Sequence, residues 1–198
     1  MIKFVYFDIN SVLCNTTGVY KEMAKILGVS VARFRELFEE LTRLLDAGKL
    51  EFDEFLMGFN KRLEKKVDLS TLKGAHYYGR IPIKPMHKFV VEIKDKYKVG
   101  LLSNLGRGVI DDFIKHGFVP DVEYNSVIIS ADAGFTKPQK GIFEFAEKDS
   151  GFSGKEILFI DDLDVNVITA KDFGWNAIVY DQTNHDKFLK ESNRLLTS

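Results

Sequence analysis

Apolar residues recur along this chain in two patterns, one typical of buried strands and one typical of helices. Residues 2–7 are apolar except for Lys3, and further apolar runs lie at 98–104, 126–130, 156–162 and 176–180. Helical spacing of apolar residues predicts helices over 82–97, 109–116, 141–149 and 165–173. Because strands and helices alternate after residue 97, we expect a parallel sheet covered on both faces, the doubly wound, Rossmann-like α/β class.

The block from about residue 18 to residue 63 shows only the helical pattern. Its clearest apolar stripe consists of Phe34, Leu37, Phe38, Leu41, Leu44 and Leu45. We therefore predict a small helical bundle inserted after the first strand. The expected domains are an α/β core of residues 1–14 and 81–198 and a helical cap of residues 15–80. An insertion after the carboxyl end of a strand lies over the ligand-binding edge, so the cap is a candidate lid.

Composition and charge narrow the classes of partner. The 198 residues carry a net charge of −1 and are 45% hydrophobic, which is typical of an ordinary globular protein. Without a basic stripe, neither nucleic acid nor a membrane surface is an expected partner. No apolar run reaches the roughly 18 residues of a membrane span, and the single cysteine excludes a disulfide framework. We expect a cytoplasmic protein, whose oligomeric state the sequence does not indicate.

Polar side chains lie at the ends of three predicted strands. They are Asp8, the pair Ser103 and Asn104, and the pair Asp161 and Asp162. Because the carboxyl ends of parallel strands meet at one edge of a doubly wound sheet, these side chains are expected to share a cleft. Asp8, Asp161 and Asp162 together concentrate negative charge that requires a cation, and an all-oxygen ligand set suits Mg²⁺.

Lys137 adds a positive charge to this set from the loop around residues 134–138. Ser103 can donate a hydrogen bond to an anionic group, and Lys137 can neutralise both that group and a carboxylate. A metal with cationic donors around an anion is typical of phosphoryl transfer. A carboxylate nucleophile would divide the hydrolysis of a phosphate ester into two steps through an aspartyl-phosphate.

Four segments carry these residues: FDINSVL at 7–13, LLSN at 101–104, TKPQKGIF at 136–143 and FIDDLDVN at 159–166. In this order they resemble the haloacid dehalogenase (HAD) superfamily, in the phosphatase-rich branch with a helical cap inserted after the first motif. The resemblance covers nearly the whole chain and is weakest in the cap. It implies a HAD-like fold and a Mg²⁺-dependent hydrolase that acts on a small phosphorylated substrate.

The resemblance implies how the substrate is held and attacked. Asp8 is expected to be the nucleophile. Ser103 and the backbone of Asn104 are expected to bind the phosphoryl group, and Lys137 is expected to orient Asp8 and to offset charge.

The resemblance also implies a metal site. Asp8 and Asp162 are expected to bind Mg²⁺ directly, and Asn10 is expected to contribute its backbone carbonyl. Asp161 is expected beside Asp162, in some cases acting through water, and Asn166 is expected to support this loop.

Asn10 departs from the family pattern, which has a second Asp at this place. That Asp protonates the leaving oxygen and then deprotonates the water, neither of which an amide can do. Such general acid–base help is worth ~10²–10⁴-fold. Ser11 also replaces the usual Gly, a smaller departure because serine tolerates many turn geometries.

Three interpretations of Asn10 stay open. In the first, the chain is a phosphatase that has weaker activity, takes its acid from elsewhere or acts on a substrate with a good leaving group. In the second, it binds phosphorylated ligands without turnover. In the third, the asparagine is a trapping substitution. Carbon–halogen hydrolysis, the chemistry that names the superfamily, works without a metal, and the Asp161–Asp162 pair argues against it.

Other chemically suggestive residues are interpreted as structural. Cys14 has no basic neighbour in sequence and is expected to pack as a small apolar residue. The four histidines, including His76, lack metal-ligand spacing. Phe52 and Phe55 are expected to belong to the core of the cap rather than to a surface for substrate.

Overall fold

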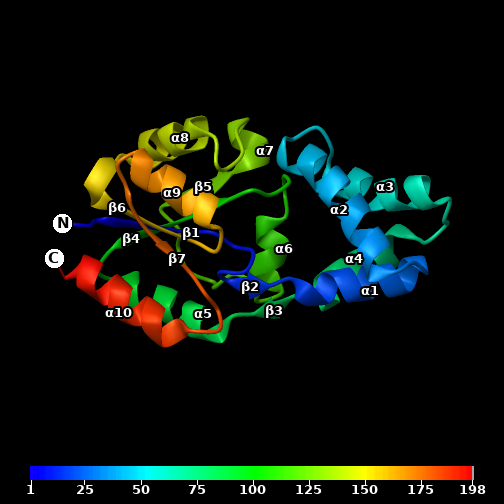
Figure 1. The fold of residues 1–198 in the computed structure, drawn as a ribbon, viewed down its shortest axis with the longest axis horizontal. Helices are drawn as coiled ribbons and strands as arrows, with labels where there is room; N and C mark the ends of the chain where they lie inside the picture. The colour runs from blue at the N-terminus through cyan, green and yellow to red at the C-terminus, as the bar shows by residue number, and fades with distance from the viewer. Residues whose placement is uncertain (198) are drawn as a thin grey trace.

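The computed structural model describes residues 1–197, and its core is a parallel sheet in the order β5-β4-β1-β6-β7 (Figure 1). The strands are β1 (Phe4–Phe7), β4 (Lys98–Ser103), β5 (Ser126–Ile129), β6 (Ile157–Asp161) and β7 (Asn176–Val179). β1 is central, and its Phe7 is in register with Leu101 of β4 and Ile160 of β6. The predicted α/β class is confirmed, and the carboxyl ends of β1, β4 and β6 are adjacent.

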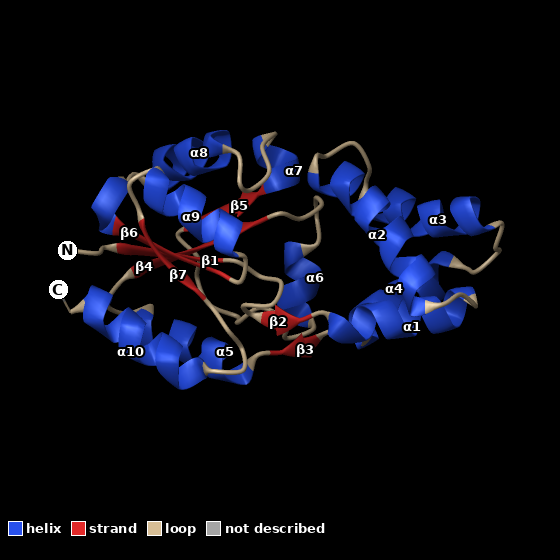
Figure 2. Cartoon of the chain, viewed as in Figure 1, coloured by secondary structure: helices blue, strands red, loops and turns tan. Residues whose placement is uncertain are grey.

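Helices pack on both faces of this sheet (Figure 2). One face carries α5 (Lys84–Ile93), α6 (Ile110–Lys115) and α10 (His185–Leu196); the other carries α8 (Lys140–Ser150) and α9 (Asp164–Asp172). The short α7 (Ser130–Ala133) and the 3-10 turn η1 (Gly154–Glu156) lie in connections. No helix in the described part of the chain is long and apolar enough to cross a membrane.

The two faces of β1 explain its almost continuous apolar run. Val5 and Phe7 join the apolar cluster beneath α5, α6 and α10, while Phe4 and Tyr6 join the cluster beneath α8 and α9. Successive side chains of a strand point to opposite faces, so a strand covered on both faces must be apolar throughout.

The helical cap lies beyond the carboxyl ends of the strands (Figure 1). It contains α1 (Thr17–Leu27), α2 (Val31–Asp46), α3 (Phe52–Leu63) and α4 (Leu69–Tyr78), between the short antiparallel strands β2 (Cys14–Asn15) and β3 (Ile81–Pro82). Its apolar stripes form a separate cluster that includes Phe34, Leu41 and Phe59. The helical insertion after the first strand is therefore present, while the domain boundaries at residues 14 and 80 stay a prediction.

Local capping determines where the cap helices begin and end. Ser30 Oγ accepts a hydrogen bond from Arg33 N at 3.2 Å, and Asp68 Oδ1 accepts one from Thr71 N at 2.8 Å. Gly28 ends α1 with φ 65°, in the left-handed region that glycine favours. These contacts satisfy backbone groups that the helix ends would otherwise leave unpaired.

Two helices differ from the prediction: α10 is not predicted, and α5 starts later than predicted. The apolar residues of α10 that pack on the core are Phe188, Leu189, Leu195 and Leu196, which recur at helical spacing, so the sequence did carry a signal for this helix. The helix predicted over 82–97 starts only at Lys84, because Pro82 pairs with β2.

Gly18 and Gly79 bring the first and last cap helices into backbone contact. A Cβ on Gly79 would lie 2.3 Å from Val19 N. We expect Gly79→Ala to lower the free energy of unfolding by about 1–3 kcal/mol, the usual cost of overpacking. Gly74→Ala is the matched control within α4, since its Cβ would come no closer than 3.5 Å to Tyr78. Urea denaturation compares the two variants, and equal stability would contradict the close approach.

Candidate active site

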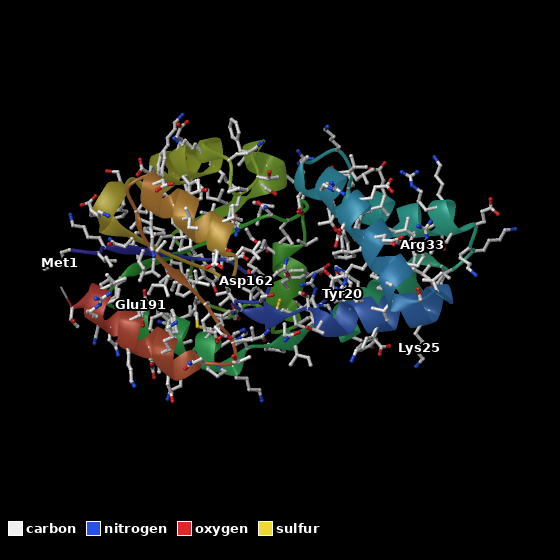
Figure 3. The ribbon with its side chains drawn as sticks, in the orientation of Figure 1. Met1, Tyr20, Lys25, Arg33, Asp162 and Glu191 are labelled. Atoms are coloured by element: carbon white, nitrogen blue, oxygen red, sulfur yellow. The ribbon has the colours of Figure 1, made fainter. Side chains whose placement is uncertain are left out.

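A cavity of about 310 Å³ lies between the cap and the strand ends. The lining residues from the core include Asp8, Asn104, Lys137 and Asp162. The lining residues from the cap include Tyr20, Phe38, Thr42, Asp46, Phe52, Phe55 and His76. Figure 3 shows Asp162 and Tyr20 on the parts of the core and the cap that approach each other. The cavity therefore combines strand-end carboxylates with a largely aromatic cap wall.

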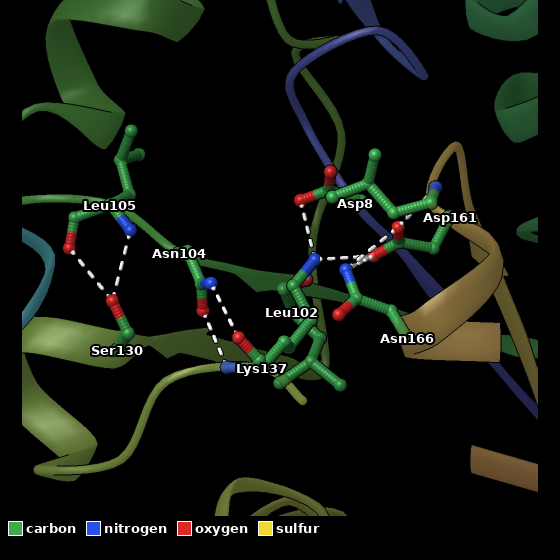
Figure 4. Close-up of polar contacts among 9 residues, drawn as sticks. Asp8, Leu102, Asn104, Leu105, Ser130, Lys137, Asp161 and Asn166 are labelled. Atoms are coloured by element: carbon green, nitrogen blue, oxygen red, sulfur yellow. Dashed lines mark hydrogen bonds and ion pairs between the residues drawn. The ribbon is translucent and has the colours of Figure 1, made fainter. Parts of the chain in front are cut away.

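Lys137 lies at the centre of the polar contacts in the core wall (Figure 4). Its Nζ lies 2.8 Å from Asp8 Oδ1 and 2.6 Å from Asp161 Oδ2, and it donates to the carbonyl of Leu102 at 3.0 Å. All three N–H donors are thus used. Burial alone would lower the pKa of this ammonium, but the carboxylates of Asp8 and Asp161 raise it above its usual value. Lys137 is a buried, charged lysine that holds two strand ends together.

Asp161 is buried at the end of β6, and the protein engages both of its oxygens. Besides its contact with Lys137, it accepts hydrogen bonds from Asn166 Nδ2 at 2.9 and 3.0 Å and from Leu163 N at 2.9 Å. These contacts suit a residue that orients Lys137 and the loop after β6. Asn166 lies where the sequence analysis places it, in support of that loop.

Asn104 fastens the loop that carries Lys137. Its Oδ1 accepts a hydrogen bond from Lys137 N at 2.7 Å, and its Nδ2 donates to Lys137 O at 3.0 Å (Figure 4). The two bonds fix the backbone of Lys137 against the end of β4. From the sequence a role is expected only for the backbone of Asn104, and this positioning by its side chain is not predicted.

Ser103 ends β4 close to Asp8. Its buried Oγ makes no hydrogen bond of normal geometry to the described residues, but it is close enough to Asp8 to act against the rise in the pKa of that carboxyl. A buried polar group left unpaired costs about 1–3 kcal/mol, so the position favours a donor kept for a ligand.

Asp8, Asp161 and Asp162 form a carboxylate cluster at the ends of β1 and β6. One oxygen from each lies within 4.8 Å of the others. Burial raises the pKa of Asp8. The charge of Lys137 acts to lower this pKa, and the charge of Asp161 acts to raise it further. Burial, with the charges of Asp8 and Asp161, raises the pKa of Asp162 to about 7. One lysine does not balance three carboxylates, so the cluster has both the charge and the oxygen donors that fit Mg²⁺.

Asn10 is held from the cap side by Arg80, the residue before β3. Arg80 Nη1 donates to Asn10 Oδ1 at 2.8 Å, and its Nη2 lies 3.0 Å from His76 Nε2. Both Arg80 and His76 are buried, and Arg80 Nε and His76 Nδ1 have no partner among residues 1–197. His76 is therefore part of the cavity wall and not only a structural residue of α4. Arg80 is absent from the residues that the sequence analysis selects, because it stands alone in the linker.

Cys14 is buried, as expected of a packing residue. Arg80 Nη1 nevertheless approaches its Sγ to 3.6 Å, a basic neighbour that the linear sequence does not show. Burial dominates and raises the pKa of the thiol, so the arginine does not make it reactive.

Ser11 adopts φ 61°, in the left-handed region. This conformation costs roughly 1–2 kcal/mol in a residue with a side chain, which explains why glycine is usual here. Serine does form the turn, and Ser11 lines the cavity next to Asn10.

Phe52 and Phe55 pack in the cap, as the sequence predicts. Phe55 is buried in the cap cluster and Phe52 packs against it. Both residues also line the cavity, so the same aromatic surface serves the cap core and the site.

Asp46 and Thr42, near the end of α2, line the cavity but are not among the predicted site residues. Burial, followed by the nearby charge of Asp8, raises the pKa of Asp46 to about 7. The sequence did contain a signal for Asp46. A carboxylate at the C-terminal end of a predicted helix opposes the helix dipole, and such an unfavourable position can indicate a functional residue.

Comparisons with known proteins agree with this geometry. Residues 2–174 match the haloacid dehalogenase-like hydrolase family. D-ribitol-5-phosphate phosphatase of Bacteroides thetaiotaomicron is 27% identical over 192 residues, which cover 89% of this chain and 91% of that protein. The structure of a predicted HAD-like family hydrolase from Porphyromonas gingivalis matches with a TM-score of 0.81 and 25% identity, covering 100% of this chain and 99% of that one.

A further structural match is the HAD family enzyme bt-2542 of Bacteroides thetaiotaomicron, in complex with magnesium and inorganic phosphate. Its TM-score is 0.77 at 20% identity, with 92% of this chain and 96% of that chain covered. The helical cap after the first strand and the family match over residues 2–174 lead to one conclusion: the chain belongs to the haloacid dehalogenase-like hydrolases.

Proposed function

We propose that this hydrolase cleaves small phosphate monoesters with Mg²⁺, through a phosphoryl intermediate on Asp8. The observation that carries the proposal is the position of Asp8. It follows the central strand, lines the cavity and is held at 2.8 Å by the buried ammonium of Lys137. This arrangement gives a fixed carboxylate that faces the ligand, as nucleophilic catalysis requires.

Asp8 attacks the phosphorus of the substrate, and the bond to the leaving alcohol breaks. Water then hydrolyses the aspartyl-phosphate and releases phosphate. Lys137 favours the ionised form of Asp8 and offsets the negative charge of the phosphoryl group. Ser103 Oγ, which makes no hydrogen bond of normal geometry within residues 1–197, donates to a phosphoryl oxygen together with the backbone of Asn104.

The carboxylates of Asp8 and Asp162 and the backbone carbonyl of Asn10 would hold Mg²⁺, which supplies charge neutralisation at the phosphoryl oxygens when it is bound. Asp161 is close enough to contribute, but its oxygens already accept bonds from Lys137, Leu163 and Asn166. We assign Asp161 an indirect part in the metal site, through water and through the orientation of Lys137.

The relatives support this chemistry. The curated relative is a phosphatase of D-ribitol 5-phosphate, and the enzyme bt-2542 has been crystallised with magnesium and inorganic phosphate. The carboxylate cluster of this chain provides matching ligand chemistry.

Removal of divalent metal is expected to lower kcat by at least about 10²-fold, because metal ions stabilise transition-state charge by several kcal/mol. The measurement is phosphate release from an aryl phosphate, an alkyl phosphate and D-ribitol 5-phosphate, before and after chelation and after Mg²⁺ is restored. Full activity after chelation would contradict the proposed dependence on Mg²⁺.

A second candidate function is suggested by Asn10 alone: Mg²⁺-dependent binding of a phosphate ester without turnover. Calorimetric titration with the same three esters, beside the turnover assay, separates the two functions. Binding with no release of phosphate, even from the aryl ester, would favour the binding protein.

A further inference from the structure

Asn10 leaves the proposed reaction without the proton donor that position 10 usually supplies. Its amide oxygen is occupied by Arg80 Nη1 at 2.8 Å, and an amide neither donates a proton to a leaving oxygen nor takes one from water. Turnover of an unactivated alkyl ester therefore requires another titratable side chain that faces the phosphoryl group.

Asp46 is a carboxyl in the cavity outside the metal cluster. It is the last residue of α2 and lines the cavity from the cap, whereas Asp8 and Asp162 line it from the core. It does not belong to the group of carboxylates whose oxygens lie within 4.8 Å of one another. Asp46 thus lines the same cavity as the core carboxylates, from the cap side.

The end of α2 is anchored to the core, which fixes where Asp46 lies. Ser130 Oγ donates to the carbonyl of Asp46 at 2.7 Å, and Arg107 Nη1 donates to the carbonyl of Gly48 at 3.0 Å. Ser130 Oγ also accepts from Leu105 N at 3.0 Å, next to the phosphoryl-binding end of β4 (Figure 4). The cap segment that carries Asp46 is therefore held against the core wall of the site.

No structural role accounts for this carboxyl. It makes no hydrogen bond or salt bridge to another residue within 1–197, although it is only partly exposed. At the C-terminal end of a helix a carboxylate opposes the helix dipole, a position in which asparagine would be more stable. A residue that costs stability and faces the ligand is typical of a functional site.

Three other titratable side chains of the cavity are less suited to this role. Lys137 uses all three donors, Arg80 is bonded to Asn10 and to His76, and burial keeps the pKa of His76 well below its usual value. The upward shift of the Asp46 pKa, described above, agrees with a carboxyl that exchanges a proton near neutral pH.

We propose that Asp46 is the general acid and base of this enzyme, in place of the side chain at position 10. The inference rests on the proposed phosphatase function and deepens it. Protonated Asp46 donates its proton to the ester oxygen as Asp8 forms its bond to phosphorus and the bond from phosphorus to the ester oxygen breaks. The products of this step are the free alcohol, the aspartyl-phosphate and the Asp46 carboxylate.

In the second step Asp46 removes a proton from water. The water oxygen bonds to phosphorus and the bond from phosphorus to Asp8 breaks. Phosphate leaves, Asp8 is again a carboxylate and Asp46 is again protonated. The assignment therefore extends the expected substrates to unactivated alkyl phosphates, whose leaving oxygen needs a proton.

The test compares Asp46→Asn with Asp53→Asn, a cap carboxyl outside the cavity that is paired with Lys73 at 2.6 Å. For Asp46→Asn we expect kcat on an alkyl phosphate to fall by about 10²–10⁴-fold. With an aryl phosphate, whose leaving group needs little help, the variant should release a rapid burst of one phenol per active site. The aspartyl-phosphate then accumulates, because its hydrolysis lacks the base. Asp53→Asn should match the unmodified chain in both assays.

The melting temperature separates catalysis from folding, because a structural role for Asp46 would make Asp46→Asn less stable. We expect Asp46→Asn to be at least as stable as the unmodified chain, since the helix dipole favours the amide.

Two results would overturn the inference while leaving the proposed function intact. One is an Asp46→Asn variant with unchanged kcat on the alkyl ester and no burst. The other is an unmodified chain that hydrolyses only the aryl ester, together with an Asn10→Asp variant that is about 10²-fold or more faster on the alkyl ester. This pair of results would show that the chain has no general acid unless position 10 is an aspartate. By contrast, an unmodified chain that turns over no ester at all contradicts the proposed function itself.

Discussion

Replacing Asp8 with asparagine is expected to lower kcat on every phosphate ester by about 10⁴-fold or more, because loss of a catalytic nucleophile removes the covalent pathway. Asp8 follows the central strand, is paired with Lys137 at 2.8 Å and belongs to the acidic cluster. The amide that replaces the carboxylate cannot attack phosphorus, and it also weakens the metal site. Phosphate release from aryl and alkyl esters measures the effect.

The fold is expected to survive this change. Lys137 keeps its contact with Asp161 at 2.6 Å, and one of three mutually repelling carboxylates is removed. Asp95→Asn is a suitable control, since this side chain is 78% exposed and precedes β4, at the opposite end of that strand from Ser103. A folded Asp8→Asn variant that keeps substantial turnover would show that the nucleophile lies elsewhere.

Lys137→Met is expected to lower the free energy of unfolding by about 3–5 kcal/mol, because it leaves two buried carboxylates without their cation. The lysine side chain is 1% exposed and bridges Asp8 and Asp161. Turnover should fall as well, since the charge that offsets the phosphoryl group is lost. Mg²⁺ should restore part of the stability, because a divalent cation among the same carboxylates replaces some of the missing charge.

Urea denaturation with Mg²⁺ and with a chelator measures this effect. Lys88→Met is the matched control, a lysine whose side chain is 78% exposed and 3.6 Å from Glu92. Exposed pairs of this kind contribute little, so the control should stay close to the unmodified chain. Equal stability of the two variants would contradict the central place of Lys137 in the site.

The core of the fold could be predicted because its strands are buried on both faces. Residues 4–7 have no polar position, and each strand end that matters for the site carries a polar residue directly after the apolar run. The strands β2 and β3 escaped prediction because they are only two residues long. α10 escaped prediction although its apolar residues recur at helical spacing.

The core half of the site could also be predicted, because it depends on short motifs at strand ends. Asp8, Asn104, Lys137 and Asp162 all line one cavity. The cap half could not be predicted, because its residues become neighbours only through the packing of helices. Asp46 follows an apolar stripe and looks like the end of a helix, although the fold places it in the wall of the cavity.

The most direct test of the account is a search for phosphate on Asp8 during turnover. The chain would be mixed with Mg²⁺ and an aryl phosphate, quenched rapidly in acid and digested. The mass of the peptide that contains Asp8 would then be measured by mass spectrometry. The account predicts one added phosphoryl group on Asp8, absent from Asp8→Asn and more abundant in Asp46→Asn. Turnover with no phosphorylated Asp8 in either the unmodified chain or Asp46→Asn would contradict it.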